Sequence, residues 1–425
     1  MKTLPASIAA IALCATVAAP QAQAQQPRYL GVASCAYSGC HGGTEPLQAT
    51  SVLQNEYYTW LNRDRHAQAY NVLFDERSTR IARNMRLRTK AWEAAICLDC
   101  HTTHLPDSAV EGTVDREDGV QCEACHGPAS GWRDEHAEPG WTHEQSVAAG
   151  MIDLRDIVRR ASLCVGCHVG DARKEVGHEL IASGHPVLTF ELDNYTASMP
   201  PHWKPGPETA GIEAWAVGQV VKFRQSLENL ARHAEGETWP EFADMDCGSC
   251  HHSLRDSEWR QERGWPGRAG LPSWSPQHWA VLRLVIGHVA PSIRSELDPL
   301  VADLGAAVAR MEKGGVAGRA RRARALVDAA LPRVTAARWS PQDVRALMRA
   351  IAGDQQTILA ADIQAAEQAA LSLHSLATVL TSRNPLLLRS PMVRAIDQLF
   401  VELRARNDYD ARRFAARLAE LQPLL

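Results

Sequence analysis

Ten cysteines and five histidines in this chain share one repeated arrangement. The cysteines form five pairs, and a histidine directly follows the second cysteine of every pair. Four pairs have the spacing Cys-x-x-Cys-His, which is typical of covalent c-type haem attachment: two thiols bond to the macrocycle and the histidine binds the iron as proximal ligand. These four motifs are Cys97-Leu-Asp-Cys100-His101, Cys122-Glu-Ala-Cys125-His126, Cys164-Val-Gly-Cys167-His168 and Cys247-Gly-Ser-Cys250-His251.

Disulfides and zinc sites are the alternative uses of paired cysteines. Neither of them requires a histidine after the second cysteine. Histidine accounts for only 17 of the 425 residues, so its presence after all five pairs favours haem over both alternatives.

The remaining pair has an unusual spacing. Four residues separate Cys35 from Cys40, and His41 follows. A disulfide between these two cysteines is one interpretation. A longer loop can also present both thiols to one macrocycle, and Gly39 eases the necessary bend. Since the other eight cysteines of the five pairs belong to regular motifs, we predict a fifth haem c here.

A second axial ligand is needed wherever an iron is six-coordinate, and histidine or methionine can supply it. The surplus of histidines predicts mostly bis-histidine haems of low potential. We expect His66 on a helix that begins near Trp60, and His185 in a turn shaped by Gly184. The predicted distal ligands are His66, His104, His136, His178 and His185, with His202 as a further candidate. His143 and His233 are expected at the surface, and His374 is expected to be structural.

The first 24 residues resemble an export signal. Lys2 precedes an apolar run that ends near Ala22-Gln23-Ala24, which is the pattern of a cleaved secretory signal peptide. The run is shorter than the roughly 20 residues that a membrane anchor needs. We therefore predict a periplasmic protein that is soluble after cleavage, and its net charge of −4 gives no support for a nucleic-acid partner.

The motifs and the composition divide the chain into regions. Residues 25–262 are predicted to form a multihaem domain of short helices and long loops with little β-structure, because five macrocycles supply much of its apolar core. Residues 263–279, rich in Pro, Gly and Trp, are read as a linker. Residues 280–425 contain no cysteine and have helical periodicity. We therefore predict that they form a bundle of four to six helices without haem, and that the fold as a whole is mainly α. Ser340-Pro341 and Ser390-Pro391 are predicted helix starts.

Several segments resemble the cytochrome c554 family of multihaem electron acceptors. These are Tyr29-Leu-Gly-Val-Ala-Ser-Cys35, Trp60 with His66-Ala67, and Gly119-Val-Gln-Cys122-Glu-Ala-Cys125-His126-Gly-Pro128, the last also resembling the haem core of nitrite reductases and hydroxylamine oxidoreductases. The resemblance covers residues 28–255 and implies haem c and electron transfer. Two differences stand out: the family carries four haems with ordinary spacing at the first, and the nitrite reductase motif CxxCK is absent here.

Two functions are compatible with these motifs. The first is an electron carrier of a respiratory or chemolithotrophic nitrogen or sulfur pathway, with redox proteins as donor and acceptor and a membrane oxidoreductase as a further partner class. The second is an enzyme with one open haem that acts on nitrite, hydroxylamine, nitric oxide or a sulfur oxyanion. Because an iron with two histidine ligands cannot readily bind substrate, the histidine surplus favours the carrier.

Overall fold

The computed structural model describes residues 26–204, 210–252, 261–265, 267–361 and 363–425. The predicted signal peptide, residues 1–24, lies outside this range. The described chain is mainly α, as predicted, and its β-structure consists of two isolated bridges, Tyr29 with Val110 and Met245 with Trp274. In the same described ranges, no helix has the length and apolar character needed to cross a membrane.

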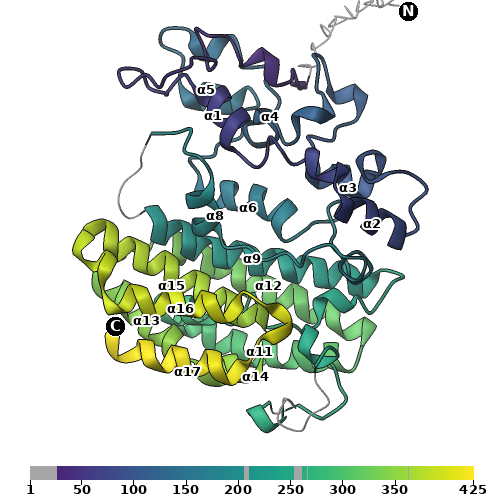
Figure 1. Ribbon diagram of the computed structural model, residues 1–425, viewed down its shortest axis with the longest axis vertical. Helices are drawn as coiled ribbons and strands as arrows, with labels where there is room; N and C mark the ends of the chain where they lie inside the picture. Colours follow the sequence, from purple (N-terminus) through teal and green to yellow (C-terminus); the bar gives the residue numbers. More distant parts are fainter. Residues whose placement is uncertain (1–25, 205–209, 253–260, 266, 362) are drawn as a thin grey trace, which may run out of the picture.

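The motif-bearing half consists of short helices joined by long loops, as the sequence predicts (Figure 1). Its α-helices are α1 (Glu56–Arg63), α2 (Glu76–Asn84), α3 (Ala95–His101), α4 (Cys122–His126), α5 (His143–Ala148), α6 (Ile157–His168), α7 (His178–Ala182) and α8 (Leu192–Ser198).

The other half is a helical bundle, drawn in green and yellow in Figure 1. Its helices are α9 (Ala210–Glu235), α10 (Leu282–Val289), α11 (Pro291–Ala309), α12 (Lys313–Thr335), α13 (Pro341–Gly353), α14 (Gln355–Ala360), α15 (Ile363–Arg383), α16 (Pro391–Leu403) and α17 (Ala411–Leu421).

The bundle is more finely divided than the sequence suggested. Eight helices, α10 to α17, lie within the described part of residues 280–425, where we expected four to six. Short breaks divide the longer helical stretches, as at Ala290, where the backbone leaves the helical region and Pro291 starts α11. The predicted starts of α13 and α16 are confirmed, because the Ser340 and Ser390 hydroxyls accept hydrogen bonds from the backbone N–H groups of Asp343 and Val393.

Helix α9 joins the two halves. It packs against α12 of the bundle and against α6 and α8 of the motif-bearing half, and Figure 1 shows it between them. Its Trp215, Phe223 and Leu227 are fully buried. The sequence had placed this segment in the multihaem domain rather than in the bundle.

Apolar burial is distributed very unevenly. One large core runs through the bundle and reaches only as far as α6 and α8 in the other half. The rest of the motif-bearing half holds two small clusters, one around Tyr70, Leu73 and Leu98 and one around Val32 and Trp60. This part of the chain has too few buried apolar side chains to account for its own packing.

Candidate haem-binding sites

Three of the motifs are helical, and the helix explains their spacing. Helices α3, α4 and α6 end at His101, His126 and His168 respectively. In an α-helix, residues three and four apart lie on one face. Both thiols and the histidine of a Cys-x-x-Cys-His motif therefore point to the same side. The first pair lies outside any α-helix, after the 3₁₀ turn Val32–Ser34, so a turn positions Cys40 and His41 instead.

Three motif histidines each lie opposite one of the predicted distal ligands. The ring centroids of His41 and His136 are 6.1 Å apart, those of His168 and His66 are 6.2 Å apart, and those of His251 and His178 are 6.3 Å apart. Each pair joins segments that are distant in the sequence.

This separation suits two ligands of one metal ion. Two imidazoles on opposite faces of an iron have centroids about 6 Å apart, since each metal–nitrogen bond is about 2.0 Å long and the ring centre lies about 1 Å further. The three observed separations, 6.1 to 6.3 Å, agree with this geometry. The residues present therefore fit haem c at these sites.

The hydrogen bonds of the candidate ligands leave one ring nitrogen available. A carboxylate or carbonyl oxygen can only accept, so an Nδ1 beside such an oxygen carries the proton and Nε2 keeps its lone pair for a metal. The Nδ1 atoms of six candidates donate in this way: His41 to Glu56 (3.0 Å), His66 to Asp64 (3.0 Å), His101 to the Ala69 carbonyl (2.8 Å), His136 to the Arg133 carbonyl, His185 to the Pro186 carbonyl (2.8 Å) and His202 to the Pro200 carbonyl (3.4 Å).

Other histidines use Nε2 for a structural contact. The Nε2 atoms of His143 and His288 lie 2.9 and 3.1 Å from the carboxylates of Asp153 and Asp343. His374, on α15 of the bundle, instead uses Nδ1 for a hydrogen bond with Asn194 of α8. The structural reading of His374 agrees with this position.

The two remaining motif histidines have different neighbours. His126 is half-buried, and burial, followed by the nearby charge of His202, lowers its pKa to about 4. Burial also lowers the pKa of His185, with the charges of His101 and Arg77 contributing. The charge of His202 thus acts on His126, as does that of His41, and the charge of His101 acts on His185. A neutral imidazole is the form that binds metal.

His104 differs from the other predicted ligands in its surroundings. Its Nδ1 lies 2.5 Å from the carboxylate of Asp99, and within the described chain no ring contact joins it to a motif histidine. His66 also differs from expectation: α1 ends at Arg63, so His66 lies in the turn that follows, where Asp64 accepts hydrogen bonds from both its backbone and its ring.

The fifth pair of cysteines borders a cavity of about 370 Å³. Cys247, Cys250 and His251 line one side, and His178 lines it from α7. Residues 169–178, which directly follow the fourth motif, also line it. The cavity has room beside both thiols, and it places the fourth and fifth sites next to each other.

The other motif cysteines also lie close together. The Cys100 and Cys167 thiols are within hydrogen-bonding reach of one another. Burial, followed by the nearby Cys35, raises the pKa of Cys122 to about 12. Burial, followed by Cys164, does the same for Cys125. These interactions link the first pair to the third, the third to the fourth, and the fourth to the second.

A buried carboxylate inside the third motif connects it to the first. Glu123, 2 % exposed, accepts hydrogen bonds from the backbone N–H groups of Leu30, Gly31 and Ala129 at 2.7 to 3.0 Å. Gln121 accepts another from Val32 at 2.9 Å. Nothing in the sequence marks Glu123, because the middle residues of such motifs are free to vary.

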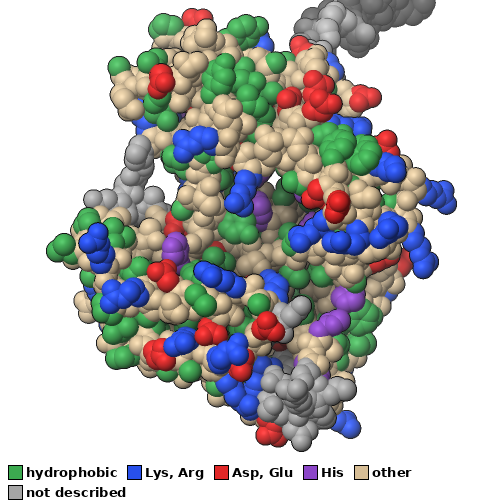
Figure 2. Space-filling model, in the orientation of Figure 1, with side chains coloured by type: hydrophobic (Ala, Val, Ile, Leu, Met, Phe, Trp, Pro, Cys, Tyr) green, Lys and Arg blue, Asp and Glu red, His purple; other side chains and the backbone are tan. Residues whose placement is uncertain are grey.

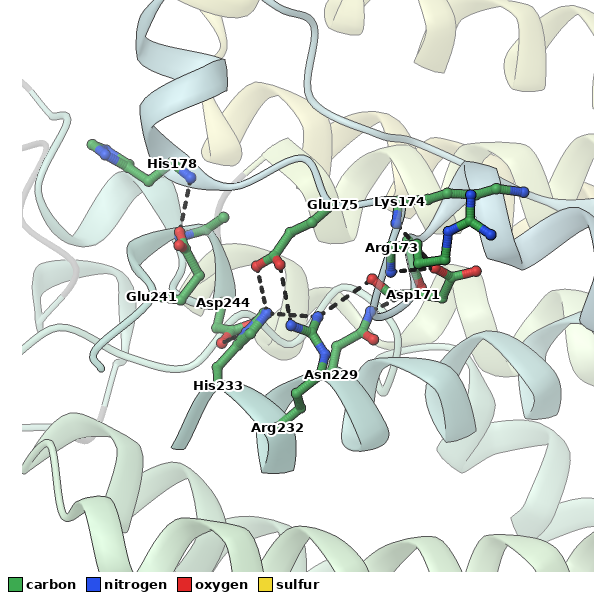
Figure 3. A network of polar contacts seen from close by, with 12 residues as sticks. Asp171, Arg173, Lys174, Glu175, His178, Asn229, Arg232, His233, Glu241 and Asp244 are labelled. Carbon is green, nitrogen blue, oxygen red and sulfur yellow. Dashed lines mark hydrogen bonds and ion pairs between the residues drawn. The ribbon is translucent and has the colours of Figure 1, made fainter. Parts of the chain in front are cut away.

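A network of charged side chains lies on the wall of the cavity at the fifth site (Figure 3). His233, near the end of α9, contacts Glu175 through Nε2 and Asp244 through Nδ1, each at 2.7 Å. Arg232 pairs with the same Glu175 at 3.1 Å. Glu241 accepts a hydrogen bond from the backbone N–H of His178 at 2.8 Å.

The network corrects the expectation that His233 is a surface residue, since only 8 % of it is exposed. Burial opposes its protonation, but the hydrogen bonds to Asp244 and Glu175 prevail and raise its pKa to about 9. The hydrogen bond from His233 in turn lowers the pKa of Glu175 to about 2. His233 is thus a buried cation held by two carboxylates.

Comparison with known proteins gives one match. Residues 34–127 match the family described as "Cytochrome c554 and c-prime", which confirms the resemblance seen in the sequence and includes the first three cysteine pairs. The chain is a haem c-binding electron-transfer protein on this ground. No curated protein and no solved structure matches it.

Replacing Glu123 by alanine should destabilise the junction of the first and third sites. Three backbone N–H groups would lose their acceptor. Because unsatisfied buried donors are costly, we expect the unfolding free energy to fall by about 3 kcal/mol. Thermal and urea unfolding of Glu123→Ala against Glu111→Ala, a change of an exposed glutamate, measures it. Equal stability of the two variants would contradict the anchoring role.

The contribution of His233 to stability should depend on pH. Its pKa in the folded protein, about 9, is above the ordinary value of about 6.5, so its stabilisation is complete below pH 6.5 and is lost as pH rises through 9. We expect the difference in unfolding free energy between the wild type and His233→Gln to shrink by about 3 kcal/mol between pH 6 and pH 10. A difference that stays constant over this range would contradict it.

Proposed function

We propose, with the membership of residues 34–127 in the cytochrome c554 family as the premise, that this chain is a pentahaem c-type cytochrome that carries electrons one at a time. Its five cysteine pairs would each hold one haem c. Mostly bis-histidine ligation would fill the axial positions of the irons. The expected setting is a periplasmic respiratory or chemolithotrophic pathway of nitrogen or sulfur compounds.

The observation that carries this proposal is the set of three histidine pairs at 6.1 to 6.3 Å. Each pair would occupy both faces of one iron, which leaves no position for a substrate. His185 opposite His101, and His202 opposite His126, would complete the set.

Haem c, when bound, supplies a couple between ferric and ferrous iron whose potential depends on the axial ligands and their surroundings. The carboxylates of Glu56 and Asp64 accept the Nδ1 protons of His41 and His66. Such partners fix the orientation of the ring and raise the basicity of the ligand, which favours ferric iron. Both residues therefore support low potentials at the first and fourth sites.

Location and partners are proposed on sequence grounds. The signal pattern in residues 1–24 supports export to the periplasm. The donor and acceptor would be other redox proteins, and a membrane-bound oxidoreductase is a further partner class.

One observation favours the alternative, an oxidoreductase with one open haem. Among the described residues, ring contacts with other histidines are recorded for only three motif histidines. An open position would therefore lie at His101 or His126. Ligand exchange at the second or third site is where such an activity would be found.

The number of haems can be counted directly. A mass spectrum of the mature chain should show five covalent haems, and a Cys35→Ala, Cys40→Ala double variant should show four. Removing Cys97 and Cys100 instead gives a matched control, because a regular motif should also account for one haem. Four haems in the wild type, unchanged by loss of Cys35 and Cys40, would contradict the fifth site.

Removal of one distal ligand should open one iron. In His66→Ala the iron at the fourth site would lose the ligand opposite His168, so one high-spin ferric signal should appear and the reduced protein should bind one carbon monoxide. His143→Ala is the matched control, since the Nε2 of His143 is already bonded to Asp153. An unchanged low-spin spectrum in His66→Ala would show that His66 is not a ligand.

A further inference from the structure

Six basic side chains cluster on α2 and the loop that follows it. They are all exposed, and we call them the α2 basic patch: Arg77, Arg80, Arg83, Arg86, Arg88 and Lys90. Figure 2 shows Lys and Arg side chains gathered on the side of the molecule where Figure 1 places α2. So dense a group of like charges raises the local positive potential although the whole chain has a net charge of −4.

The patch is not neutralised within the chain. In the described residues, no carboxylate lies within ion-pair distance of any of these six groups. The arginines of α12 differ: Arg319 pairs with Asp303 at 2.6 Å, and Arg321 and Arg324 pair with glutamates of α9. These three arginines thus hold α12 against the neighbouring helices α9 and α11. The α2 basic patch forms no such ion pairs among the described residues.

Helix α2 covers the second haem site. Its buried residues Ile81 and Ala82 face inward, and Ala82 belongs to the cluster against which Cys97 packs. Asn84 donates a hydrogen bond to the Ser183 carbonyl at 3.1 Å. Ser183 is two residues before His185. Helix α2 therefore shares an apolar cluster with α3 and holds the segment before the proposed distal ligand His185, while its exposed residues carry the charge.

Exposed apolar residues adjoin the patch. Phe74, just before α2, is 51 % exposed and stacks on Trp92 with ring centroids 4.6 Å apart. Val72 is 43 % exposed. An apolar area beside charged groups is the usual composition of a protein–protein interface.

We propose that the α2 basic patch is the docking surface for an acidic redox protein, which exchanges electrons with the haem held at Cys97, Cys100 and His101. The proposal rests on the electron-carrier function proposed above. Electron transfer weakens steeply with distance, so a surface directly over one haem selects a partner that carries its own redox centre. Opposite charge would orient that partner and raise the association rate.

Flavodoxin hydroquinone, an acidic one-electron donor, can serve as the probe. It gives up one electron to become the semiquinone, and one ferric haem becomes ferrous. Stopped-flow absorbance would give the second-order rate constant for the holoprotein at ionic strengths from 10 to 500 mM. We expect the rate constant to fall by about tenfold over this range, as electrostatic steering predicts.

Charge reversal tests the surface itself. Arg80→Glu with Arg83→Glu should lower the rate constant about tenfold at low ionic strength and remove most of its salt dependence. The matched control is Arg333→Glu with Arg338→Glu, which makes the same change of net charge at exposed positions on and after α12. The control should stay within about twofold of the wild type. Equal loss in both variants would overturn the proposal, since bulk charge would then be responsible.

Two further measurements separate the possible failures. Dithionite should reduce every haem of the wild type and of both variants, and failure of this reduction in the wild type would refute the carrier function rather than the docking surface. Sedimentation with phosphatidylglycerol vesicles tests an anionic membrane as the occupant. Binding to vesicles that depends on Arg80 and Arg83, without any effect of these residues on the flavodoxin rate, would overturn the protein partner.

Discussion

In the proposed haem sites, the need to hold a flat group between two imidazoles would constrain the motif-bearing half more than any other requirement. Two histidines from distant segments must stay about 6 Å apart with free lone pairs directed at one point. At several candidate ligands the chain meets this requirement by hydrogen-bonding the far nitrogen of the ring, as Asp64 does for His66 and Glu56 does for His41. The loops that carry these carboxylates are therefore as important for the sites as the ligands themselves.

The same requirement explains the uneven packing. Between Cys35 and His251 the chain carries five cysteine pairs that are each followed by a histidine, and the apolar clusters around the first three pairs are small. The helical bundle, which holds most of the buried apolar side chains, contacts the motif-bearing half. Lys222 of α9, fully buried, donates to the Phe190 carbonyl at 2.9 Å, and the Phe190 ring lies 4.9 Å from that of His168. The motif histidine His168 thus packs against Phe190, whose backbone is bound by a lysine of α9.

The sequence was sufficient for the motifs, the mainly α fold and the starts of α13 and α16, because these depend on residues near one another in the chain. It was less informative where contacts cross between segments. His136 follows the third motif but lies opposite His41 of the first, and no local pattern predicts that. His233 was expected at the surface, yet it lies between the carboxylates of Glu175 and Asp244. Only the packing of α9 against residues 169–178 brings these groups together.

The central claim is that both axial positions of every iron are filled by histidine. Electron paramagnetic resonance of the oxidised wild-type holoprotein, followed by carbon monoxide addition to the reduced form, tests it most directly. The account predicts only low-spin ferric signals and no spectral change with carbon monoxide. A high-spin ferric signal in the oxidised protein, together with a spectral change when carbon monoxide is added to the reduced protein, would contradict it and would favour an open catalytic haem.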